Sequence, residues 1–123
     1  MIRSLAVPMI LFVMLATLVA GCGSSSSPSS PSPMGMTVTI PVGARSLGTG
    51  GYAPNPVTVA AGTTITWTNT DSIAHTATSD TPGLFDSGSI APGGMFSTTL
   101  QSRGSVTYKC TFHPGMVGTI VVQ

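Results

Sequence analysis

The stretch Thr63-Thr-Ile-Thr-Trp-Thr-Asn69 decides the fold. Ile65 and Trp67 alternate with threonines, so an extended chain places both apolar side chains on one face and the hydroxyls on the other. This period of two, in β-branched and aromatic residues, predicts a strand that is buried on one face only. The stretch therefore favours a protein built from sheets.

Similar alternation recurs on both sides of this stretch, between turns rich in Gly, Pro and Asp. Strands are predicted at 36–40, 57–59, 63–69, 74–78, 95–100, 104–110 and 117–122. Residues 43–56 hold several glycines and two prolines, which predicts a loop. Fifteen glycines, ten prolines and few strong helix formers after residue 33 argue against a helical bundle. Seven to eight short strands in one domain, residues 34–123, predict an all-β Greek-key β-sandwich.

The first 21 residues read as a secretory signal peptide. Arg3 gives a positive start, and a mostly apolar run follows from Leu5 to Val19. A transmembrane anchor is the alternative, but the run is short for a spanning helix and ends in small residues. Val19-Ala-Gly-Cys22 resembles a bacterial lipobox, which implies cleavage before Cys22 and lipidation of that cysteine. The chain is then a lipoprotein anchored in the cell envelope, and Gly23 favours the periplasmic side of the outer membrane over the inner membrane.

Residues 24–33 are all Ser or Pro. Such a segment has nothing apolar to bury, so residues 22–33 are predicted to be a lipidated cysteine followed by a solvated linker. The linker would tether the domain to the membrane.

Charged residues are scarce. The chain has four Lys and Arg and three acidic residues, too few for a nucleic-acid footprint, which needs clustered cations against phosphates. Without residues 1–21, three cations balance three carboxylates, so long-range steering of a partner is not expected to dominate. The second cysteine, Cys110, has no disulfide partner in the domain. Exported proteins normally pair their cysteines, so the presence of an unpaired thiol needs an explanation.

The segment Cys110-Thr-Phe-His113-Pro-Gly-Met116 supplies that explanation. A thiolate, an imidazole and a thioether within seven residues suit copper better than magnesium, calcium or manganese. His75 is the remaining histidine and could approach from a neighbouring strand. Each residue alone has a plain structural interpretation, as a core Met or Cys or as a hydrogen-bonded His. Together, His75, Cys110, His113 and Met116 predict two imidazoles, a thiolate and a weak axial thioether around one copper ion.

These residues carry a resemblance to the cupredoxins, the blue-copper family. It extends through Thr64-Ile-Thr-Trp-Thr-Asn69, His75-Thr76, Phe85-Asp-Ser-Gly88, Pro92-Gly93, Phe96, Val106-Thr-Tyr-Lys-Cys110 and Gly118-Thr-Ile-Val-Val122. The Cys-x-x-His-x-x-Met spacing is similar to that of amicyanin, while plastocyanin has a longer loop. The resemblance implies a cupredoxin-like sandwich with one type 1 copper at one end, held by the four residues named above.

The chain departs from the family pattern after the first histidine. Plastocyanin-like proteins often have Asn there, whereas this chain has Thr76. Thr76 and Thr111 are therefore predicted to pair beside the metal and to help orient its ligands. The resemblance also implies that His113 lies in an apolar surface patch, with Pro114, the 52–54 loop and the 91–93 turn as candidate members.

The expected function is single-electron transfer between protein redox partners in the cell envelope, by a monomer. No catalytic base, nucleophile or open metal position is evident, so an enzyme is not expected. Two alternatives remain. A copper-delivery or copper-buffering lipoprotein would use the same ligands and exchange metal readily, and a metal-free adhesion sandwich would be indifferent to loss of Cys110.

Overall fold

The computed structural model describes residues 34–123, so the predicted signal peptide, lipidation site Cys22 and linker lie outside the described residues. The described part forms two 3-10 turns and seven strands. The turns are η1 (Ala44–Ser46) and η2 (Gly48–Gly51). The strands are β1 (Met36–Ile40), β2 (Val57–Val59), β3 (Thr64–Asn69), β4 (Thr78–Ser79), β5 (Met95–Thr99), β6 (Gly104–Lys109) and β7 (Val117–Val122). None of the helical turns in residues 34–123 has the length and apolar character needed to cross a bilayer.

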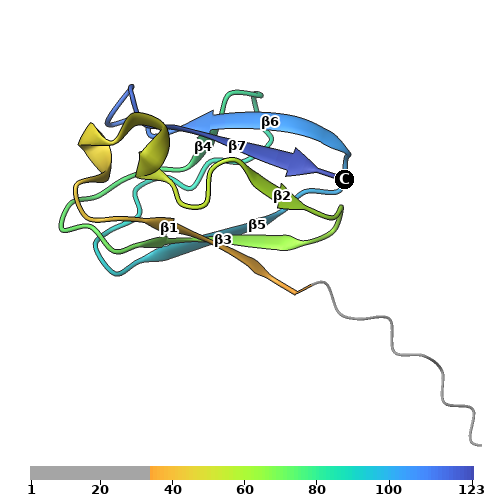
Figure 1. Ribbon diagram of the computed structural model, residues 1–123, viewed down its shortest axis with the longest axis horizontal. Coiled ribbons are helices and arrows are strands. Elements are labelled where there is room, and N and C mark those ends of the chain that lie inside the picture. The colour runs from red at the N-terminus through yellow and green to blue at the C-terminus, as the bar shows by residue number, and fades with distance from the viewer. Residues whose placement is uncertain (1–33) are drawn as a thin grey trace, which may run out of the picture.

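Two sheets face each other, which confirms the predicted all-β sandwich (Figure 1). One has the strand order β1-β3-β5 and the other β2-β7-β6-β4. β1 runs parallel to β3, and β2 runs parallel to β7, while the remaining pairs are antiparallel. The core lies between the sheets and is formed by buried apolar side chains of both, such as Val38 and Ile65 of the first sheet and Val57 and Ile120 of the second.

Trp67 lies at the centre of this core. It is fully buried on β3, between Val38 of β1 and Phe96 of β5 in the strand register. Tyr108 of β6 meets it from the other sheet, with the two ring centroids 5.4 Å apart in an edge-on arrangement. The alternation of Ile65 and Trp67 with threonines thus has the predicted effect, one buried face and one hydroxyl-bearing face.

The predicted strand at 74–78 is wrong. Only Thr78 and Ser79 form a strand, and His75 makes an isolated bridge to Ile90. The reason is that the intervening backbone bonds elsewhere. The N–H of Thr76 faces the sulfur of Cys110, and that of Ala77 donates to Ser87 Oγ at 2.7 Å.

The loops that carry the candidate ligands gather at one end of the sandwich (Figure 1). η1 and η2, the segment after β3 and the β6–β7 connection all lie there, whereas the chain enters β1 at the opposite end. The sandwich therefore separates the candidate site from the point where the N-terminal segment joins the domain.

Candidate metal centre

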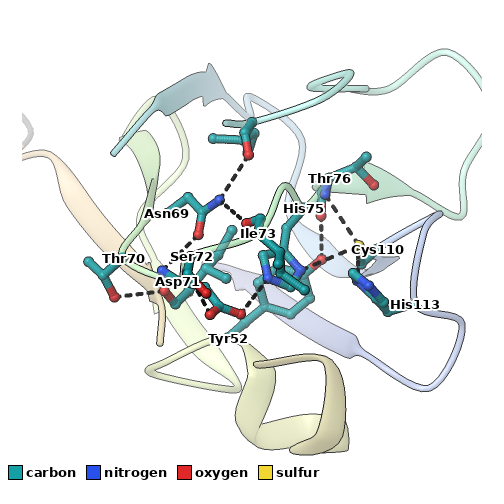
Figure 2. A network of polar contacts seen from close by, with 12 residues as sticks. Tyr52, Asn69, Thr70, Asp71, Ser72, Ile73, His75, Thr76, Cys110 and His113 are labelled. Atoms are coloured by element: carbon teal, nitrogen blue, oxygen red, sulfur yellow. Dashed lines mark hydrogen bonds and ion pairs between the residues drawn. The ribbon is translucent and has the colours of Figure 1, made fainter. Parts of the chain in front are cut away.

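Three of the four predicted ligands converge in space. One donor atom from each of His75, Cys110 and His113 lies within 4.8 Å of the other two. Cys110 Sγ is 3.8 Å from His75 Nδ1 and 3.4 Å from His113 Nδ1. The three side chains lie together in Figure 2. His75 and Cys110 are fully buried, and His113 is partly exposed.

The β6–β7 connection is a closed turn that positions Cys110 and Met116 together. The N–H of Cys110 donates to the carbonyl of Met116 at 3.0 Å, and the N–H of Met116 donates to the carbonyl of His113 at 2.9 Å. Met116 is fully buried beside η2. A Cβ on Gly51 would lie 3.2 Å from the Met116 sulfur and 2.6 Å from its Cγ, so the absence of a side chain at 51 makes room for the thioether.

The segment that carries His75 is braced by the buried amide of Asn69. The Asn69 side-chain N–H groups donate to the carbonyls of Ile73 at 2.8 Å and Ile90 at 2.9 Å. Its Oδ1 accepts the N–H of Asp71 at 2.9 Å. These three bonds hold the loop that leads from β3 to His75, as Figure 2 shows.

A carboxylate contacts the outer nitrogen of His75. His75 Nε2 lies 2.9 Å from Asp71 Oδ2, and both side chains are nearly inaccessible to solvent. The hydrogen bond from His75 is the main cause that lowers the Asp71 pKa to about 2, with burial opposing it and backbone N–H donors assisting. Asp71 is therefore an ionised, buried carboxylate at neutral pH.

Thr76 and Thr111 lie in contact, as the sequence predicts. Their hydroxyl oxygens are 3.2 Å apart, and the N–H of Thr111 donates to Thr76 Oγ1 at 2.8 Å. The N–H of Thr76 also donates to Cys110 Sγ at 3.3 Å. Thr76 thus connects the two segments that carry the candidate ligands.

Tyr52 is placed differently from the prediction. It was a candidate member of the surface patch, but its side chain is 1% exposed and its hydroxyl donates to the carbonyl of Thr76. Burial raises the Tyr52 pKa well above its usual range, so the phenol stays protonated. Ala53 and Pro54, its neighbours in the 52–54 loop, are exposed.

His113 has a lowered pKa. Burial is the main cause, because it disfavours the imidazolium; the nearby His75 and Arg45 lower the pKa further, and Asp71 opposes them. The lowered pKa favours the neutral ring, whose nitrogen lone pair can bind a metal.

Asn69, Asp71 and Gly51 were not identified from the sequence. An Asn at a strand end with Asp two residues later is a known turn signal, and Asp71 is four residues from His75. In a loop, a spacing of four residues does not by itself predict a contact, so the contact between Asp71 and His75 is known only from the structure.

The donor set fits a copper ion. Metal bonds to imidazole nitrogen and thiolate sulfur of about 2.0 to 2.3 Å place two donors on one ion about 3 to 4 Å apart. The observed nitrogen–sulfur separations of 3.4 and 3.8 Å lie in that range. Two imidazoles and a thiol, with the buried thioether of Met116 in the same β6–β7 connection as Cys110 and His113, are ligand types that favour copper over hard cations.

Comparison with known proteins identifies the family. Residues 36–123 match the family model "copper binding proteins, plastocyanin/azurin family". Plastocyanin of Cucumis sativus is 34% identical over 86 residues, which cover 58% of this chain and 87% of the plastocyanin.

Solved structures give the same result. A purple cupredoxin from Nitrosopumilus maritimus superposes with a TM-score of 0.67 at 33% identity, over 72% of this chain and 99% of that one. A reduced Cu(I) form of amicyanin superposes with a TM-score of 0.60 at 24% identity, over 72% of this chain and 82% of the amicyanin, and supports the fold alone. The chain therefore belongs to the plastocyanin/azurin family of copper-binding proteins.

Proposed function

We propose that this protein carries single electrons between protein redox partners, using one type 1 copper bound by His75, Cys110, His113 and Met116. The observation that carries the proposal is the convergence of two imidazoles on a buried thiol, with all three donor atoms within 4.8 Å of one another. Bound copper supplies a one-electron couple between its +2 and +1 states.

The surrounding residues hold the donors in place. The sulfur of Cys110 receives the N–H of Thr76, and His75 is fixed by Asp71. Donors held in this way move little when the charge of the site changes, which favours rapid electron transfer. The same packing excludes water from Cys110 and Met116, which are fully buried.

His113 is the proposed point of electron exit, since it is the partly exposed ring of the pair. Apolar side chains are exposed at this end of the molecule, including Phe112 (53%), Leu47 (49%) and Val42 (74%). Leu47 precedes Gly48, which approaches Gly115 of the ligand loop. Such a surface, with few charges, suits a small and transient contact with a redox partner.

We further propose that the chain is exported and anchored through lipid on Cys22, on the periplasmic side of the outer membrane. The support is the lipobox-like sequence and the position of the domain's N-terminal end. Met36 begins β1 at the end opposite the ligand loops (Figure 1). A tether joined there leaves the His113 end free for partners.

The proposal assigns no substrate turnover. The Thermus scotoductus copper-containing nitrite reductase superposes with a TM-score of 0.61 at 24% identity, but this chain spans only 23% of it. That likeness supports the fold and gives no reason to assign the reductase's activity.

The test is to load the protein with one equivalent of Cu(II) and to record its visible and EPR spectra. We expect an intense thiolate-to-copper band, a small copper hyperfine splitting and reversible voltammetry. Cys110→Ser removes the thiolate and should abolish the band. A colourless wild-type protein would overturn the proposal. Rapid loss of Cu(I) to a chelator without reversible voltammetry would instead indicate copper delivery or buffering.

A further inference from the structure

We propose that Asp71 is a positioning residue that fixes which nitrogen of His75 faces the copper and lowers the reduction potential of the site. The inference deepens the proposed electron-transfer function and rests on it. It concerns a residue that the ligand motif does not contain.

The geometry of the His75 ring assigns different roles to its two nitrogens. Nδ1 faces Cys110 Sγ at 3.8 Å, and Nε2 faces Asp71 Oδ2 at 2.9 Å. An ionised carboxylate only accepts hydrogen bonds, so Nε2 must carry the hydrogen. The lone pair of the neutral ring then lies on Nδ1, toward the sulfur. Asp71 thereby selects the tautomer that can bind a metal at that point.

The carboxylate is itself held in place. Its Oδ1 accepts the N–H of Ser72 at 2.8 Å, and the backbone N–H of Asp71 is bound by Asn69. Within residues 34–123, His75 is the only basic side chain that forms an ion pair with Asp71, because the other ion pair joins Lys109 to Asp80. Arg45 lines the same surface pocket as Asp71 but forms no ion pair with it.

A buried negative charge behind a ligand ring acts on the redox equilibrium. Asp71 is 5% exposed, so water screens its charge weakly. The charge stabilises the more positive, oxidised form of the site relative to the reduced form. Asp71 should therefore make the protein a weaker oxidant than the four ligands alone would.

The first experiment compares reduction potentials, measured by voltammetry of copper-loaded protein, for wild type, Asp71→Asn and Asp80→Asn. Asn keeps the shape and can still accept from Nε2, so this change isolates the charge. We expect Asp71→Asn to shift the equilibrium toward the reduced form by about tenfold, a rise of about 59 mV for a one-electron couple. Asp80 is exposed and bound to Lys109, so Asp80→Asn should change the equilibrium by less than about twofold.

The second experiment needs no copper. Nitrogen-15 NMR of the metal-free protein at pH 8 reports the tautomer of each neutral histidine. We expect His75 to carry its hydrogen on Nε2 in wild type and to become a mixture of tautomers in Asp71→Leu.

The two readouts separate the possible failures. An unchanged potential in Asp71→Asn, or a wild-type His75 with its hydrogen on Nδ1, would overturn the role of Asp71. Absence of the thiolate-to-copper band in wild type would overturn the proposed function, and the tautomer measurement alone would then decide whether Asp71 positions His75.

Discussion

The two segments that carry the histidines, 69–76 and 110–116, are built in different ways. In the first, the side chains of Asn69, Asp71 and His75 are buried and bonded to one another or to nearby backbone. In the second, backbone bonds close the turn, while Phe112 and Pro114 are exposed. The difference indicates that the two segments have different roles: the first holds the metal site rigid, and the second exposes it to a partner.

Histidine replacement should give the largest effect and tests this division directly. His75→Gly and His113→Gly should each remove nearly all of the thiolate-to-copper band. Added imidazole should restore colour in His113→Gly, because that site is open to solvent, and should fail in His75→Gly, where the ring is 0% exposed. The measurement is a visible titration with imidazole. Equal restoration in both variants would remove the distinction between the segments.

The hydrogen bonds of Asn69 should contribute to the free energy of unfolding. Asn69→Ala removes three hydrogen bonds of a fully buried side chain and should lower the free energy of unfolding of the metal-free protein by about 2 to 3 kcal/mol. Phe112→Ala, in the exposed segment, should change it by no more than about 0.5 kcal/mol. Denaturant titrations measure both. A larger loss in Phe112→Ala would mean that the second segment carries the stability.

The packing of Met116 can be tested with a pair of glycines. Gly51→Ala places a Cβ 2.6 Å from Met116 Cγ and 2.8 Å from the carbonyl of Ala44, so we expect a loss of about 1 to 3 kcal/mol and an altered visible spectrum. Gly50→Ala is the control, since its Cβ would meet only Leu47 Cβ at 3.5 Å. Equal stability and equal visible spectra in the two variants would contradict this expectation, because they would mean that the Met116 side chain can move away from a Cβ at position 51.

The smallest expected effect is a pH dependence of stability. The pKa of Asp71 falls from 3.8 to about 2, mainly through the hydrogen bond from His75. Between these pH values the unfolded chain binds the Asp71 proton and the folded chain does not, so this contribution is present above pH 4 and is lost as pH falls toward 2. Asp71→Asn lacks it. Denaturation of metal-free protein should therefore show a stability gap between wild type and variant that narrows on acidification, and a gap independent of pH would contradict this account.

Much of the fold could be predicted because its signals are local. The β1, β3, β5, β6 and β7 strands agree with the predictions to within one residue at each end, since the alternation of apolar and polar residues is read over five to seven positions. The 74–78 strand could not be predicted correctly. His75 and Thr76 have the composition of a strand, but their backbone groups are taken by Ile90 and Cys110, which lie far along the chain.

The sequence by itself determined the sandwich, the four candidate ligands and copper as the metal, because strand periodicity and ligand softness are properties of single residues and short spacings. The tertiary structure alone decided that Tyr52 is buried, that Gly51 faces Met116 and that Asp71 contacts His75. These contacts depend on how loops from different strands meet at one end of the sandwich. Contacts between loops produce no repeating pattern of apolar and polar residues in the sequence. The conformation of a loop depends on the strands that it joins and on the residues that it packs against.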